Sequence, residues 1–189
     1  GDKSGAGLIY GNLSLNFMRN GNVTEAIPYL KKAIELHEAI DYKLALENWY
    51  QTIGRCYKLE SKFDEAEKYL KLAYDISKGF NNQDRIYENQ ALLLCNDFFR
   101  TKNVALLPQV IDIVKKSNDR YTKYMIFDEL IGILSNLYNL TPKNEILEYL
   151  MLLDDDKELF YEFVNIHPLK DSEEEKEFFH FLIDNENKI

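Results

Sequence analysis

The sequence predicts an all-α protein of stacked helical hairpins, a solenoid of about four hairpins followed by two C-terminal capping helices. Three observations predict this fold class. Apolar side chains return at about forty-residue intervals, they lie three or four positions apart within each interval, and the 189 residues include only 8 Gly and 4 Pro. Because 46% of the residues are apolar, the chain can bury one substantial core, so we expect a single domain over residues 1–189.

The clearest repeat relates residues 25–36 to residues 65–76. The two segments share Glu, Ala, Tyr, Leu, Lys and Ala at an offset of 40 residues. The segments before them keep that offset in the pairs Tyr10 and Tyr50, Phe17 and Tyr57, and Gly21 and Ser61. A register held over two helices and the turn between them predicts two similar hairpins within residues 6–80.

The remainder of the chain continues the pattern more weakly. Residues 83–153 keep apolar side chains at the equivalent positions, which predicts two degenerate hairpins. Residues 155–166 and 172–186 are expected to form two further helices, the second with an acidic start that suits the helix dipole. We interpret residues 154–189 as a cap over the last hairpin, which a solenoid needs at its end.

These residues carry a family resemblance. Tyr50, Gly54, Tyr57, Ala66 and Ala73 stand where the tetratricopeptide repeat (TPR) has its characteristic residues. The chain therefore resembles the TPR family, specifically its long-hairpin branch with a period of about 40 residues. The resemblance is clear over residues 6–80, degenerate over 83–153 and absent after residue 154.

The resemblance implies that the first helix of each hairpin lines a concave groove that binds peptides. Carrying the groove positions over by register gives a candidate peptide-binding set from three hairpins. Its members are Met18, Arg19, Asn48, Gln51, Arg55, Lys58, Asn89, Asn96 and Arg100.

The chemistry of this set suggests a ligand. Amide side chains can pair with a peptide backbone, and arginine can hold a carboxylate with two hydrogen bonds. We therefore expect the groove to bind an acidic segment or a chain terminus, the alternative being ordinary solvated side chains. Gly11 and Leu15 stand where a carboxylate-clamp chaperone adaptor would carry its first Lys and Asn, so that adaptor role is not expected.

Charge is unevenly distributed along the chain. The net charge is −9; residues 1–120 carry 17 Lys/Arg against 16 Asp/Glu, and residues 121–189 carry 6 against 16. A basic excess is what nucleic-acid binding requires, so we expect no contact with nucleic acid. The neutral first part and the acidic last part could dock between copies, which leaves a homo-oligomer open.

The motifs that carry chemistry are missing from the sequence. No phosphate-binding loop, nucleophile elbow or paired Cys/His signature occurs, and the Asp154–Asp155–Asp156 run lacks the Gly and distal Glu of a calcium loop. We therefore expect no enzymatic activity and no bound metal or cofactor. Cys56 and Cys95 lie within apolar helical patterns and are expected to be buried free thiols.

Two functions fit the family resemblance. The first is a protein- or peptide-binding scaffold. The alternative is the peptide-sensing regulatory domain of a bacterial multidomain regulator, similar to quorum-sensing TPR receptors, and the composition is compatible with an AT-rich bacterial genome.

We expect Gly1 to remain from a removed tag on an excised piece. No apolar run approaches the roughly 18 residues of a membrane span, so we expect no membrane insertion and a cytoplasmic location, with an envelope or secreted one left open.

Overall fold

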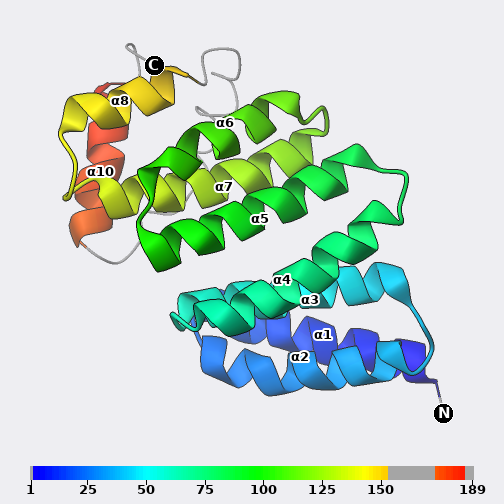
Figure 1. Cartoon of the computed structure of the whole chain (residues 1–189). Coiled ribbons are helices and arrows are strands. Elements are labelled where there is room, and N and C mark those ends of the chain that lie inside the picture. The colour runs from blue at the N-terminus through cyan, green and yellow to red at the C-terminus, as the bar shows by residue number, and fades with distance from the viewer. Residues whose placement is uncertain (1, 153–172, 186–189) are drawn as a thin grey trace. The chain divides into compact units, whose positions relative to one another are not determined.

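The computed structural model describes residues 2–152 and 173–185, and every regular element within them is helical (Figure 1). This confirms the predicted all-α class. The chain divides into two compact units, Gly1–Lys102 and Asn103–Ile189, each of which is described by itself. The helix expected over residues 155–166 lies outside the described residues, and the single-domain organisation stays a prediction.

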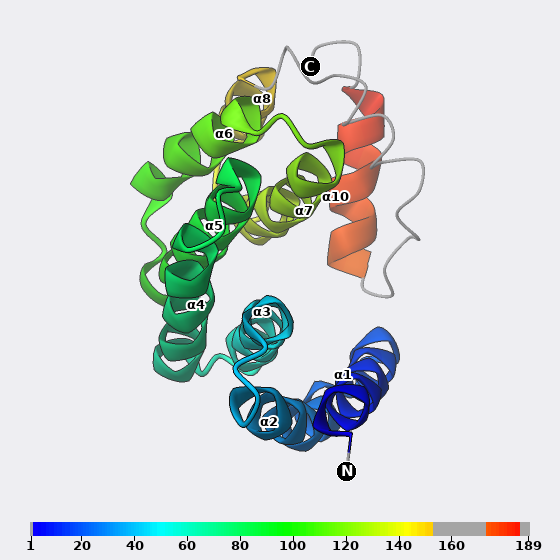
Figure 2. The same cartoon turned by 90° about the vertical axis from the view of Figure 1, so that its right-hand side faces the viewer.

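The first unit consists of two helical hairpins and a fifth helix. Helix α1 contacts α2, and α3 contacts α4, so each pair forms a hairpin. Helix α2 also contacts α3, and α4 contacts α5, so the hairpins are stacked as in a solenoid (Figure 2). The helices are α1 (Lys3–Arg19), α2 (Val23–Glu38), α3 (Lys43–Leu59), α4 (Phe63–Lys78) and α5 (Gln83–Thr101).

The turns within the two hairpins have the same backbone structure. Gly21 has φ 75° and Ser61 has φ 59°, both left-handed. In the first turn the amide of Asn22 donates to the carbonyl of Phe17 at 2.9 Å, and in the second the amide of Lys62 donates to the carbonyl of Tyr57 at 2.9 Å. This hydrogen bond closes a Schellman-type helix end in both places. The 40-residue offset therefore extends to the backbone of the turns.

Exchanging the residues at these two turns is expected to change stability in opposite directions. A left-handed φ strains a residue that has a Cβ, so Ser61→Gly should raise the free energy of unfolding by about 0.5 kcal/mol and Gly21→Ser should lower it by about 1 kcal/mol. No atom lies within 4 Å of a Cβ built at Gly21, so the effect there is one of backbone conformation. Urea denaturation followed by circular dichroism measures both changes. Equal midpoints for all three proteins would contradict the shared turn.

The core of the first unit repeats as well. Each hairpin stacks a ring of its first helix on a tyrosine of its second, with Phe17 5.0 Å from Tyr29 and Tyr57 5.7 Å from Tyr69. A third ring lies 6.4 and 6.1 Å from the same tyrosines in the pairs Tyr10–Tyr29 and Tyr50–Tyr69. The aromatic positions singled out by the sequence repeat thus make equivalent contacts in both hairpins.

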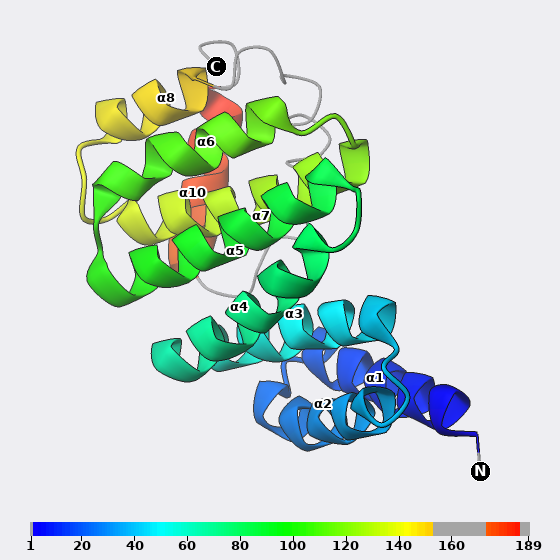
Figure 3. The ribbon, with the colours of Figure 1, turned by 45° about the vertical axis from the view of Figure 1, so that its right-hand side comes forward.

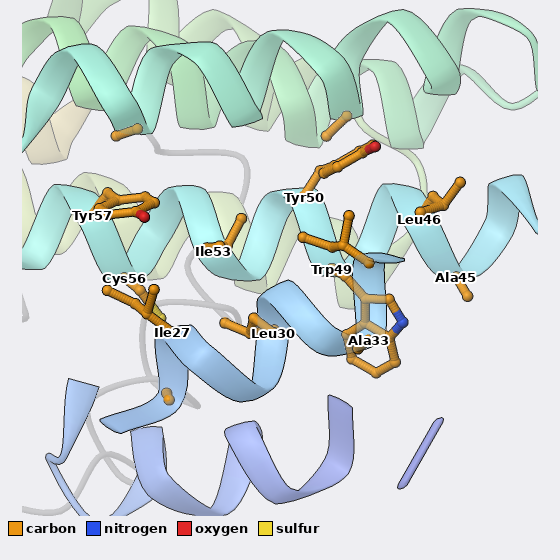
Figure 4. Packing of buried hydrophobic residues seen from close by; sticks show 14 residues of the cluster. Ile27, Leu30, Ala33, Ala45, Leu46, Trp49, Tyr50, Ile53, Cys56 and Tyr57 are labelled. Atoms are coloured by element: carbon orange, nitrogen blue, oxygen red, sulfur yellow. The ribbon is translucent and has the colours of Figure 1, made fainter. Parts of the chain in front are cut away.

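Small residues let the helices of a hairpin approach each other closely. Ala26 and Ala66 are fully buried at equivalent positions. A Cβ built at Gly54 would lie 2.7 Å from the Leu70 side chain, so α4 packs directly over the backbone of α3. Figure 4 shows Trp49 and Cys56 extending from α3 toward α2, where Leu30 is buried.

Helices α1, α2 and α3 are joined by a buried polar contact. The indole N–H of Trp49 donates to Nδ1 of His37 at 2.9 Å, and Nε2 of His37 lies 3.1 Å from the carbonyl oxygen of Ser4. A Cβ built at Gly7 would lie 2.5 Å from the His37 ring, and one at Gly11 would lie 2.3 Å from the Trp49 ring. Both glycines are therefore required by the close approach of large rings to α1.

The described residues of the second unit are helical as well. Helices α6 and α7 are in contact, and Figure 3 shows them side by side. Leu130 and Leu134 of α7 are fully buried, and Tyr138 after α7 lies 5.4 Å from Phe178 of the last helix. The described elements are a short 3-10 turn (Val104–Leu106), α6 (Leu107–Lys116), α7 (Arg120–Leu137), α8 (Lys143–Met151) and α10 (Glu173–Asp184).

Two further predictions can be compared with this fold. Cys56 and Cys95 are both fully buried, and neither forms a disulfide, as predicted. Helix α10 covers most of the helix predicted over residues 172–186. None of the helices at residues 2–152 and 173–185 has the length and apolarity needed to cross a membrane.

Candidate functional site

Four polar residues of α3 form a line along the helix that we call the α3 stripe: Asn48, Gln51, Arg55 and Lys58. Their spacings of three, four and three residues place them on one side of a helix. Asn48 is exposed and the other three are half-buried. Leu59 extends the stripe with a side chain that is 63% exposed. Helix α3 contacts both α1 and α5, the first helices of the neighbouring hairpins in this unit.

The two cations of the α3 stripe are held toward α5. The ammonium of Lys58 lies 5.5 Å from the centre of the Phe99 ring, within the range of a cation–π contact. The positive charge of Arg55 acts on the carboxyl of Glu88 and opposes a rise in its pKa. Both cations therefore have a defined setting on a partly covered surface.

Gln51 of the α3 stripe also belongs to a hydrogen-bonded network between α3 and α5, together with Glu47, Arg85 and Asn89. The Glu47 side chain is fully buried and forms an ion pair with Arg85, whose side chain is 31% exposed. Asn89 donates to Glu47 Oε1 at 3.0 Å and accepts from Gln51 Nε2 at 3.1 Å. Because each group has a partner, the network fixes the position of α5 against α3.

Burial raises the pKa of two carboxyl groups here. Desolvation raises the pKa of Glu47 above its ordinary value, although the charge and hydrogen bond of Arg85 and the hydrogen bond of Asn89 oppose the rise. Desolvation likewise raises the pKa of Glu88, against the charges of Arg55 and Arg85 and a hydrogen bond from Gln51; the charge of Glu47 adds to the rise. The region next to the α3 stripe is therefore a partly dehydrated one, where charge interactions are strong.

Met18 and Arg19, the two predicted groove residues of the first hairpin, differ in how far their side chains are exposed. Met18 is half-buried and contacts the core, so its side chain is partly used in packing. Arg19 is exposed in the last turn of α1, where a cation complements the helix dipole. Gly11, at a groove position by register, is buried because the Trp49 ring covers it.

The predicted residues of α5 lie elsewhere than a simple groove would place them. Asn89 is fully buried in the network between α3 and α5. Asn96 is 1% exposed and donates to the carbonyl oxygen of Phe63, at the start of α4, at 3.0 Å. Arg100 turns to α4 as well and donates to Glu67 at 2.8 Å. The reason is that α5 packs against α4 through this side, so equivalent positions in register do not have equivalent exposure.

The sequence-based set missed Glu47, Arg85 and Glu88. A signal for two of them exists in the repeat itself, because Glu47 is 38 residues from Arg85 and 42 from Asn89. These separations bracket the 40-residue offset that relates neighbouring first helices. Complementary polar residues at such separations predict side-by-side contacts.

The polar groups of the described residues are suited to binding a peptide rather than a metal ion. They contain no group of three or more His, Cys, Asp or Glu side chains that could hold a metal ion. The α3 stripe instead provides the exposed amide of Asn48, the amide of Gln51, whose nitrogen already donates to Asn89, two cations and an apolar end, which together suit a peptide.

Comparison with known proteins supports the helical-repeat fold of the first two hairpins. Residues 6–79 match the family model described as tetratricopeptide repeat. No curated protein matches the chain. Proteins of this repeat class use stacked hairpins as surfaces for protein–protein interaction. That the chain belongs to the long-hairpin branch of the class stays a prediction. Residues 6–79, which cover α2 to α4 and most of α1, are therefore similar to tetratricopeptide repeats.

Proposed function

We propose that the first unit is a peptide-binding scaffold and that the α3 stripe holds an acidic segment or a chain terminus of its partner. The observation that supports this most strongly is the line of Asn48, Gln51, Arg55 and Lys58 on a helix whose other sides are used for packing. An extended peptide along this line would exchange backbone hydrogen bonds with the amide of Asn48 and donate one to the amide oxygen of Gln51, whose nitrogen is held by Asn89. Its carboxylate would meet Arg55 and Lys58.

The structure narrows the expected set of contacts. Asn89 and Asn96 of α5 are buried, whereas Asn48 of α3 is exposed, so we assign the ligand to α3 rather than α5. The half-buried setting of Arg55 and Lys58 makes a bound carboxylate more strongly held than it would be by exposed lysines. A peptide-sensing regulatory role would use the same surface, so one binding test applies to both functions.

Removing both cations of the α3 stripe tests this proposal. We expect the double variant Arg55→Ala/Lys58→Ala to bind immobilised acidic peptides with free C-termini at least about tenfold more weakly, because two charge-assisted contacts are lost. Biolayer interferometry with the whole chain measures the affinity. Amidating the peptide C-terminus distinguishes a chain terminus from an acidic side chain.

A matched control removes the same charge from other helices. Lys32 on α2 and Lys68 on α4 are replaced by Ala, which leaves the α3 stripe unchanged. We expect this control to bind like the original protein. If both double variants lose affinity equally, the attraction is a general effect of net charge and the α3 stripe is not the site.

A further inference from the structure

A cavity between α4 and α5 of the first unit has a character different from that of the α3 stripe. Its volume is about 240 Å³, and we call it the α4–α5 cavity. Leu93 and Leu94 of α5 supply an apolar wall, and Glu67 and Lys71 of α4 line the other side. A cavity of this size can hold a side chain or a small organic molecule as well as water.

The α4–α5 cavity contains a buried acceptor without a partner. Asn96 lines it and is 1% exposed. The amide nitrogen of Asn96 donates to the carbonyl oxygen of Phe63 at 3.0 Å, and a carbonyl can only accept, so the orientation of the amide is fixed. Its oxygen, Oδ1, is buried and has no hydrogen-bond partner among the residues that the structure describes. A buried acceptor left in this way costs free energy that a donor would recover.

The charges at the rim favour a cation. Arg100 pairs with Asp97 at 2.7 Å and with Glu67 at 2.8 Å, and Lys71 pairs with Glu67 at 2.5 Å. Asp64 lies 3.5 Å from Arg100 as a third carboxylate. The lining thus holds two carboxylates and two cations, the exposed Asp64 adds a third carboxylate beside it, and the unpartnered group is also an acceptor. Because the unpartnered atom is an acceptor, it favours a donor, and the nearby carboxylates offset the like charge that a cationic donor meets at Arg100 and Lys71.

We propose that the α4–α5 cavity binds a protonated primary amine, with the ammonium donating to Asn96 Oδ1. An ammonium has three N–H donors and no acceptor, which matches a site whose unsatisfied atom is an acceptor. The remaining donors are directed to the carboxylates of Asp97 and Glu67. The alkyl chain of the amine lies on Leu93 and Leu94. This site is separate from the α3 stripe, which takes the opposite charge, and does not depend on it.

The amine can come from a lysine side chain of a partner or from a free alkyl diamine, and two probes distinguish these sources. N-acetyl-lysine methylamide represents the side chain, and 1,4-diaminobutane represents the free amine. The ¹H–¹⁵N spectrum of the whole chain is recorded during each titration. We expect the side-chain amide signal of Asn96 and the backbone amides of Leu93 and Leu94 to shift with one or both probes, and whichever binds more tightly identifies the source.

A neutral probe and two variants test the chemistry. Acetylating the lysine Nε removes the charge and should weaken binding by at least about tenfold. Asn96→Leu removes the acceptor and should do the same. Asp97→Asn keeps the shape of a half-buried rim residue and should weaken amine binding about threefold to tenfold. This variant still tests the proposal if Asn96→Leu does not fold. Asp75→Asn, on α4 outside the cavity, should have no effect. Unshifted Asn96 signals with both amines, or equal binding of the acetylated probe, would overturn the proposal.

Discussion

Replacing Arg85 by Ala is expected to lower the free energy of unfolding by about 3 kcal/mol at neutral pH, because it leaves a buried carboxylate without its cation. The Glu47 side chain is fully buried, and Asn89, which also hydrogen-bonds to it, is neutral. Arg85 itself is 31% exposed, so the loss comes from the unpaired charge of Glu47 rather than from lost packing of the arginine.

The pH dependence of the free energy of unfolding of this variant identifies the cause of its lost stability. The pKa of Glu47 is already raised by burial, and Arg85 is the main group that opposes the rise, so Arg85→Ala should raise that pKa further. A carboxyl with a raised pKa takes up its proton more readily in the folded protein than in the unfolded chain. The deficit of the variant should therefore be full at neutral pH and shrink as the pH falls toward 4.5, the ordinary value of a glutamate.

The isosteric replacement Glu47→Gln provides the control. In the Arg85→Ala background it removes the charge and keeps an acceptor for Asn89, so we expect it to recover about 2 kcal/mol and to abolish the pH-dependent part of the deficit. Denaturation followed by the fluorescence of Trp49, the single tryptophan, measures all four proteins of the cycle. If the double variant were no more stable than Arg85→Ala, the unpaired charge would not be the cause.

Replacing Trp49 by Ala is expected to destabilise the chain by about 3–5 kcal/mol, the usual cost of deleting a large buried aromatic side chain. Trp49 is 6% exposed, and its loss also leaves Nδ1 of His37 without its donor. Because the ring lies over Gly11, its removal opens a space directly against α1. Thermal unfolding followed by circular dichroism measures the loss, since the fluorescent probe is removed.

That space allows a reciprocal change of size. A Cβ at Gly11 would lie 2.3 Å from the Trp49 ring, so Gly11→Leu alone should destabilise the protein. In the Trp49→Ala background the leucine has room, and we expect it to recover about 1–2 kcal/mol. Additive losses in the double variant would show that the two residues are not in contact.

The sequence predicted the first two hairpins well because the same contacts occur twice. Gly21 and Ser61 end equivalent helices, and Ala26 and Ala66 are buried at equivalent close approaches. Residues at such positions are constrained by packing alone, and packing constraints repeat with the hairpin. The helix at Glu173–Asp184 was predicted for a different reason, the apolar spacing within an acidic segment.

The candidate site was harder to predict because exposure depends on the neighbouring helix. Asn48 and Asn89 are equivalent to within one residue of the repeat offset, yet the first is exposed and the second is fully buried against Glu47. Arg100 is a cation by composition but has three carboxylates around it in the fold. Periodicity identifies the side of a helix, whereas the partners of its polar groups are set by tertiary contacts.

The most direct measurement of the central claim is a ¹H–¹⁵N titration of the whole chain with an acidic peptide that has a free C-terminus, following side-chain signals. The account predicts that the amide groups of Asn48 and Gln51 and the Nε of Arg55 shift together, while the side-chain amide of Asn96 in the α4–α5 cavity stays in place. Shifts confined to α2 or α4, with the three α3 signals unchanged, would contradict it.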